Sequence, residues 1–206
     1  GVTIGAMGWA LIDGGWEWPK TWYPATLADF TTAPAVGNPP YLLFLFVPLA
    51  QLPPSVGSSI LVGLTLLSIA ITASLTGSNK WLILISYPSL YVIKMTQLDA
   101  FVLLGAAIGI WAIKNNKPYW QGLATLLLCL KPQAGLVLAL FYLWHQRNWR
   151  AFVVSSVTIV LSLFLFGFWP IVWLQKLSSI STVATQWQGG FIQGSNSISL
   201  FPFGLL

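Results

Sequence analysis

The sequence has very little charge. Of its 206 residues, nine are Lys or Arg and four are Asp or Glu, so charged residues make up only 6%, against roughly 25% in a usual soluble domain. Hydrophobic residues make up 56%, and the mean hydropathy is +0.78. So few charged groups cannot cover the wet surface of a soluble protein, but they suffice where lipid is the solvent. The composition therefore excludes a soluble domain and predicts an integral membrane protein.

The sequence also lacks the side chains that several kinds of chemistry require. Its single cysteine, Cys129, has no second cysteine for an intrachain disulfide, and its single histidine, His145, has no second histidine for a haem or zinc site. No phosphate-binding glycine loop ending in GK[ST] occurs. We therefore expect no metal and no cofactor. The net charge of +5 suits the cytoplasmic loops of a membrane protein and does not indicate binding of nucleic acid.

Long apolar runs are what the sequence does contain. Residues 55–76 and 152–174 are each long enough to cross a bilayer, which takes about 20 apolar residues. Two further apolar stretches are interrupted near their middle, one by Lys94 to Asp99 and the other by Lys131-Pro132-Gln133. The arms on either side are too short to cross alone, and such arms are typical of helices that end at a water-filled cavity within the membrane. We expect the functional site at these interruptions.

The basic loops predict the orientation and the organisation. Lys80 and the turns at 114–117 and 145–150 can share one side, which the positive-inside rule makes cytoplasmic. The interruptions then face outside. We expect one all-α polytopic membrane domain over residues 1–206, a bundle of transmembrane helices with broken or short members. Its parts are an external acidic and aromatic loop at 13–40, a helical bundle at 41–174, and an external polar loop with the start of a further apolar segment at 175–206.

The apolar sequence at both ends of the chain predicts a piece of a longer protein or a short form of one. Within the first loop, three of the four acids of the chain, Asp13, Glu17 and Asp29, stand among aromatic residues that include Trp16 and Trp18. A carboxylate can deprotonate a sugar hydroxyl, and an indole ring can stack on the apolar face of a pyranose. The alternative is an aromatic belt at the membrane surface with solvated acids, which composition alone favours.

Three ionisable residues stand at the interruptions, namely Lys94, Asp99 and Lys131. A charge at such depth costs about 2.5 to 3.5 kcal/mol, so it usually has a partner or a task. Asp99 either has a functional role or forms a purely structural ion pair with Lys94, five residues before it. Lys131 offers a point charge suited to a phosphate, and the alternative is a kinked helix whose lysine reaches the membrane surface.

Neutral hydrogen-bonding residues gather near the end of the chain. Gln193 and Asn196 belong to this group. They can bind sugar hydroxyls or form only an external loop, and composition leaves both possibilities open.

The order of five motifs resembles the polytopic glycosyltransferases of type C. The nearest group is the bacterial family of polyprenyl-phosphate-mannose-dependent mannosyltransferases, many of whose members are uncharacterised. Thr96 replaces the usual glycine before Gln97, and Asp99 stands where the family often has asparagine. The motifs are Asn38-Pro39-Pro40-Tyr41, the run from Val47 to Pro53, Thr96-Gln97-Leu98-Asp99, Gly122 and Lys131-Pro132-Gln133.

The resemblance implies an inverting enzyme at the external face of the bacterial cytoplasmic membrane. It would transfer a hexose, mannose in the family, from a polyprenyl-phosphate donor to a lipid-linked or envelope glycan. Asp13 is the best match for the general base, with Asp29 as the fallback. Lys131, with Lys94 or Lys20, would stabilise the leaving phosphate. The candidates for contact with the sugars are Trp16, Trp18, Gln97, Asp99, Gln193 and Asn196.

Two other classes of function stay open from the sequence. The short chain and its twelve tryptophans also suit a non-catalytic subunit that packs against lipids and other membrane proteins in a larger complex. Broken helices also occur in transporters, although one half of this sequence shows no repeat of the other.

Overall fold

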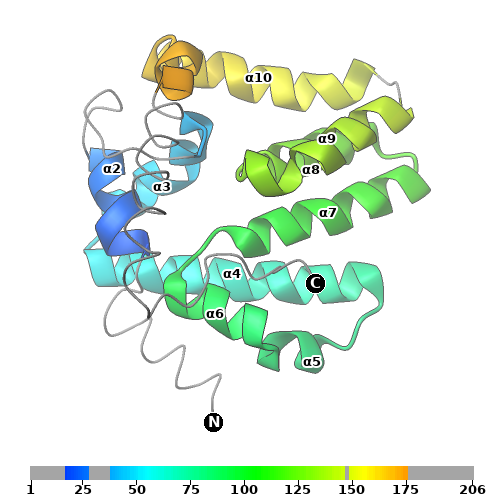
Figure 1. The fold of residues 1–206 in the computed structure, drawn as a ribbon, viewed down its shortest axis with the longest axis horizontal. Coiled ribbons are helices and arrows are strands. Elements are labelled where there is room, and N and C mark those ends of the chain that lie inside the picture. Colours follow the sequence, from blue (N-terminus) through cyan, green and yellow to red (C-terminus); the bar gives the residue numbers. More distant parts are fainter. Residues whose placement is uncertain (1–16, 28–37, 147–148, 176–206) are drawn as a thin grey trace, which may run out of the picture.

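A computed structural model describes residues 17–27, 38–146 and 149–175, and the regular elements in these ranges are helices (Figure 1). The candidate site residues Asp13, Trp16, Asp29, Gln193 and Asn196 lie outside the described ranges. In chain order, the helices are η1 (Trp18–Trp22), α2 (Tyr23–Leu27), η2 (Pro40–Leu42), α3 (Leu43–Ala50), α4 (Pro54–Thr76), α5 (Lys80–Ile85), α6 (Tyr87–Met95), α7 (Asp99–Lys114), α8 (Pro118–Leu128), α9 (Pro132–Gln146) and α10 (Trp149–Phe166).

Two of the described helices, α4 and α10, are long and apolar enough to cross a membrane. Helix α4 matches the predicted run at 55–76. Helix α10 ends earlier than the predicted run at 152–174, because Gly167 adopts a left-handed conformation with φ of 65°. The chain becomes helical again only at 169–175. The all-helical fold class is confirmed for the described residues.

The interruptions predicted in the two longer stretches are turns between helices. The turn at 96–98 separates α6 from α7, and the turn at 129–131 separates α8 from α9. Proline stands in the first turn of α6, α8 and α9, where its missing N–H is tolerated. An additional break at Ser86, between α5 and α6, was not predicted. It arises because Pro88 cannot continue the hydrogen-bond ladder of α5 into α6.

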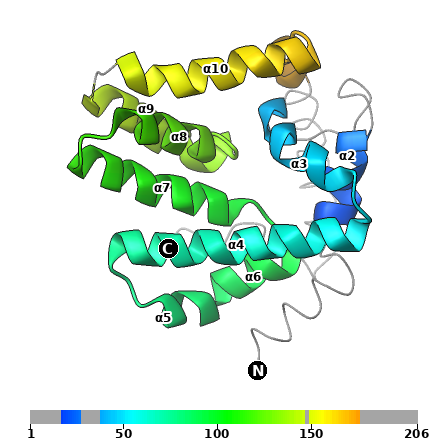
Figure 2. The same cartoon turned by 180° about the vertical axis from the view of Figure 1, so that it is seen from behind.

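Four helices lie side by side in a row. Figures 1 and 2 show α4, α7, α8 and α10 in that order, with α9 beside α8, and α2 and α3 across one end of the row. Gly122 on α8 lies against the Ala151 carbonyl of α10, where a Cβ would collide with backbone. The small residue therefore lets these two helices approach closely.

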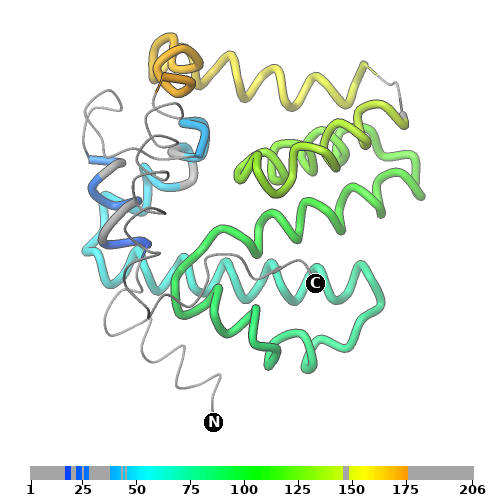
Figure 3. Tube along the Cα trace, in the orientation of Figure 1, coloured from blue at the N-terminus to red at the C-terminus, as the bar shows by residue number. Residues whose placement is uncertain are grey.

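Both turns that interrupt the predicted stretches point to the same end of the row, toward α2 and α3 (Figure 3). An aromatic core forms on that side. Trp18 and Trp22 are nearly inaccessible and pack on Phe46 of α3. The Trp18 Nε1 donates to the Pro54 carbonyl at 2.9 Å, so this core fixes the first described segment against the start of α4.

Candidate functional site

Four polar residues from four segments meet at the end of the row that carries the two turns. The Lys131 Nζ lies 2.8 Å from the Asp99 Oδ2. The Gln97 Nε2 donates to the Glu17 Oε1, also at 2.8 Å. These two pairs join the first described segment, the α6–α7 turn, the start of α7 and the α8–α9 turn into one polar cluster, which we call the Lys131 cluster (Glu17, Gln97, Asp99 and Lys131).

Lys131 is held by the way α8 ends. Because α8 ends at Leu128, the carbonyls at its end lack their helical donors. The Asn38 Nδ2 donates to the Leu130 carbonyl at 2.5 Å, and the Tyr41 Oη donates to the Leu126 carbonyl at 3.2 Å. The Asn38-Pro39-Pro40-Tyr41 motif therefore closes the end of α8 and fixes the turn that presents Lys131.

A close contact tightens the same turn from the other side. Gly135, in the first turn of α9, lies so near the Leu128 carbonyl that a Cβ could not be placed there without moving backbone. The hairpin of α8 and α9 thus needs glycine at this position.

Asp99 is placed by a strained turn. Thr96 ends α6 with φ of 54°, in the left-handed region, and its side chain is fully buried. This conformation is unfavourable for a β-branched residue. The Thr96 Oγ1 donates to the Met95 carbonyl at 2.7 Å, and α7 begins three residues later, with Asp99 in its first turn. Strain of this kind is often stored at functional sites.

Glu17 has an unusual environment for a carboxylate. Its Oε2 accepts a hydrogen bond from the Trp22 Nε1 at 3.3 Å, and its Oε1 accepts from Gln97. Burial raises the pKa of Glu17; the Lys131 charge and the two hydrogen bonds oppose this, and the Asp99 charge adds to it. The net result is a raised pKa, which brings the carboxyl group closer to the range useful for a general base.

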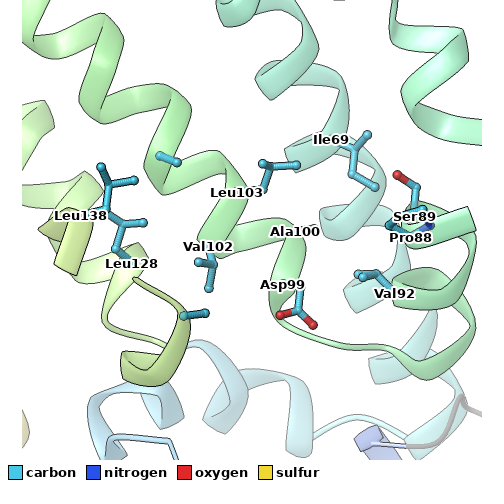
Figure 4. A pocket seen from close by; sticks show the side chains of 12 residues that line it. Ile69, Pro88, Ser89, Val92, Asp99, Ala100, Val102, Leu103, Leu128 and Leu138 are labelled. Carbon is cyan, nitrogen blue, oxygen red and sulfur yellow. The ribbon is translucent and has the colours of Figure 1, made fainter. Parts of the chain in front are cut away.

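An apolar groove of about 440 Å³ starts at this cluster, a volume within the usual range for small-molecule sites. Asp99 is the charged residue of its lining. Figure 4 shows Asp99 at the start of α7, between side chains from α4 and α6 on one flank and side chains from α8 and α9 on the other. The apolar lining includes Ile69, Val92, Leu103, Leu128 and Leu138.

A family model described as glycosyltransferase family 87 matches residues 37–201, well over half of the chain. The chain belongs to glycosyltransferase family 87. The predicted membrane glycosyltransferase family is thereby confirmed, and family 87 membership together with α4 and α10 indicates a membrane location. No curated protein and no solved structure matches the chain.

The region matched by the family 87 model contains three members of the Lys131 cluster, Gln97, Asp99 and Lys131, as well as the groove. Glu17 precedes it. Sequence reasoning singled out Gln97, Asp99 and Lys131, and the structure brings these three together. The sequence analysis named Glu17 only as one acid of the first loop. A local sequence pattern does not predict its contact with Gln97, which lies 80 residues away in the chain.

The remaining described candidates of the family 87 chain are Trp18, Lys94 and Lys20. Trp18 is fully buried between Phe46 and Tyr23, so its ring has no exposed face for a sugar, contrary to our expectation. Lys94 is exposed in the last turn of α6. The ion pair found on Asp99 is with Lys131 rather than the Lys94 pair we considered. Lys20 lies in η1. In the described ranges, no three His, Cys, Asp or Glu residues are grouped as metal ligands would be.

Proposed function

We propose that this family 87 glycosyltransferase transfers a hexose, most simply mannose, from a polyprenyl-phosphate donor to a hydroxyl of a lipid-linked or envelope glycan. The reaction would take place at the external face of a bacterial cytoplasmic membrane. The observation that carries the proposal is the ion pair of Lys131 with Asp99, because Asp99 is the one charged residue that lines an otherwise mostly apolar groove. A polyprenyl phosphate has the same pattern of an anionic head on an apolar chain.

The groove supports a lipid-borne donor over a nucleotide sugar. Besides Asp99, its one other residue with a polar side chain is Ser89, and the rest are apolar or proline. Such a lining offers little to a nucleotide base or ribose, whereas it excludes water from an isoprenoid chain. Lys131, the partner of the groove residue Asp99, would then contact the phosphate as a compact charge.

The chemistry requires a base and a stabilised leaving group. The base takes the proton of the acceptor hydroxyl, whose oxygen bonds to the anomeric carbon and inverts it. The bond from that carbon to the donor phosphate oxygen breaks, and its electron pair leaves with the phosphate. Lys131 would stabilise the charge that develops there, an effect that is strongest in a site poor in water. Lys94 and Lys20 are secondary candidates for this role.

Three carboxylates are candidates for the base. Asp13 stays our first choice from the resemblance, and Asp29 is its fallback. Glu17 joins them because it lies in the Lys131 cluster and has a raised pKa. We further propose that Gln97 and Asp99, with Trp16, Gln193 and Asn196, contact sugar hydroxyls.

Binding of farnesyl phosphate to the purified protein tests the donor site. Lys131→Gln removes the charge and should weaken binding strongly, whereas Lys131→Arg keeps the charge with a different geometry and should retain part of the affinity. Lys114→Gln is the matched control, since Lys114 is an exposed lysine in the last turn of α7. Equal affinities in all four proteins would remove Lys131 from the site and refute the proposal.

A further inference from the structure

The ion pair of the Lys131 cluster has a consequence for ligand choice. We propose that Asp99 is a specificity-determining residue, which occupies Lys131 until a phosphate borne on an apolar chain replaces it. The inference rests on the proposed function, because it takes Lys131 as the contact of the donor phosphate. It concerns how the site rejects free anions, which the donor model alone does not explain.

The two partners of the ion pair differ in how easily they can be released. The Lys131 side chain is 16% exposed and that of Asp99 is 38% exposed. Lys131 also sits on a turn whose Leu130 carbonyl is held by Asn38. Returning the more exposed carboxylate to water needs less rearrangement, so Asp99 is the partner that leaves while Lys131 stays in place.

Asp99 keeps one stabilising environment when it is released from Lys131. It lies in the first turn of α7. The N-cap residue of that helix is Leu98, whose apolar side chain cannot cap the helix. The uncapped N–H groups and the dipole at a helix start favour a carboxylate. The carboxylate can therefore leave Lys131 and remain in a favourable field at the helix start.

Charge explains why a free anion is rejected. The Lys131–Asp99 pair is neutral, and the Glu17 carboxyl nearby offers no attraction to an anion. A free phosphate ion would have to break the pair with no other gain. A phosphate whose isoprenoid chain enters the groove gains apolar burial in addition, because the residues that line the groove beside Asp99 are mostly apolar. The exchange of one anion for another on Lys131 thus selects lipid-borne phosphates.

The experiment measures the affinities of inorganic phosphate and farnesyl phosphate by calorimetry on the purified full chain. The wild type should bind farnesyl phosphate and give no signal with inorganic phosphate. Asp99→Asn should bind farnesyl phosphate about tenfold tighter, because the free energy of a partly exposed ion pair lies between the values for exposed and for buried pairs. The variant should also bind inorganic phosphate measurably. In the Lys131→Gln background, Asp99→Asn should give a smaller gain than in the wild type, because no ion pair is left to break.

Two comparisons make the experiment decisive. Glu17→Gln also removes a nearby acid without breaking the ion pair, so it should tighten binding less than Asp99→Asn. Asp99→Ser removes the same charge and can cap α7, so it should reproduce the gain and serves if Asp99→Asn does not fold.

Unchanged or weaker farnesyl-phosphate binding in a folded Asp99 variant would overturn the inference and make Asp99 an orienting residue for Lys131. An equal gain in Glu17→Gln would also overturn it. The proposed function fails separately, if Lys131→Gln binds farnesyl phosphate as well as the wild type.

Discussion

Asn38 offers a direct test of how the structure positions Lys131. Its side chain is 8% exposed, and its Nδ2 donates to the Leu130 carbonyl, one residue before Lys131. Asn38→Ala would leave that carbonyl without its donor. An unsatisfied buried polar group costs about 1 to 3 kcal/mol. For a chain of this length, each kcal/mol corresponds to roughly 2 to 4 °C in the unfolding midpoint.

The assay is thermal unfolding in detergent, followed by tryptophan fluorescence. Asn38→Ala should lower the midpoint by about 2 to 12 °C on these figures. Asn115→Ala is the matched control, because the Asn115 Nδ2 also donates to a backbone carbonyl, that of Trp111 at 2.8 Å, but at an exposed position. That variant should stay within about 0.5 kcal/mol of the wild type, as most surface substitutions do.

The same variant should report on Lys131. If Asn38 fixes the turn, Asn38→Ala should weaken farnesyl-phosphate binding even at a temperature where the protein is fully folded. Tyr41→Phe removes the bond to the Leu126 carbonyl, farther from Lys131, and should weaken binding less. An Asn38→Ala protein with the midpoint and the affinity of Asn115→Ala would refute the reasoning that the first motif closes α8.

Four further predictions follow from single residues. Because burial raises the folded-state pKa of Glu17 above 4.5, the contribution of Glu17 to stability is largest at pH values below 4.5 and is lost as the pH rises through the folded-state pKa. The stability of Glu17→Gln relative to the wild type should therefore increase over that rise in denaturation curves, and a constant difference would contradict this. At Thr96, with φ of 54°, Gly should be more stable than Ala by about 1 kcal/mol, the reverse of their usual order in helices, as chemical unfolding of the two variants would show. Gly122→Leu should disrupt the α8–α10 contact and lower the melting midpoint. Gly63→Leu in α4 should lower it less, because no atom lies near the Cβ position there. Asp13→Asn should reduce sugar transfer by about 10² to 10⁴ with membrane insertion unchanged, and loss of transfer in Asp29→Asn instead would move the role of the base to Asp29.

The sequence by itself determined one long helix, two of the turns between helices and the class of protein. The length of an apolar run predicted α4, and polar residues within the longer apolar stretches predicted the two turns. These signals could be read from the sequence because they depend only on residues close together in the chain. Proline in the first turn of α8 and α9 fixed where those helices begin. The glycosyltransferase family was also readable, since its motifs are short segments in a fixed order.

Only the tertiary structure decided which of these residues meet. Local spacing suggested Lys94 as the partner of Asp99, yet the ion pair is with Lys131, 32 residues away. Trp18 stood among aromatic residues that suited a sugar, but packing on Phe46 removed its exposed face. Such contacts depend on how the helices lie against one another, and charge, aromaticity and spacing along the chain carry no information about a partner on a different helix.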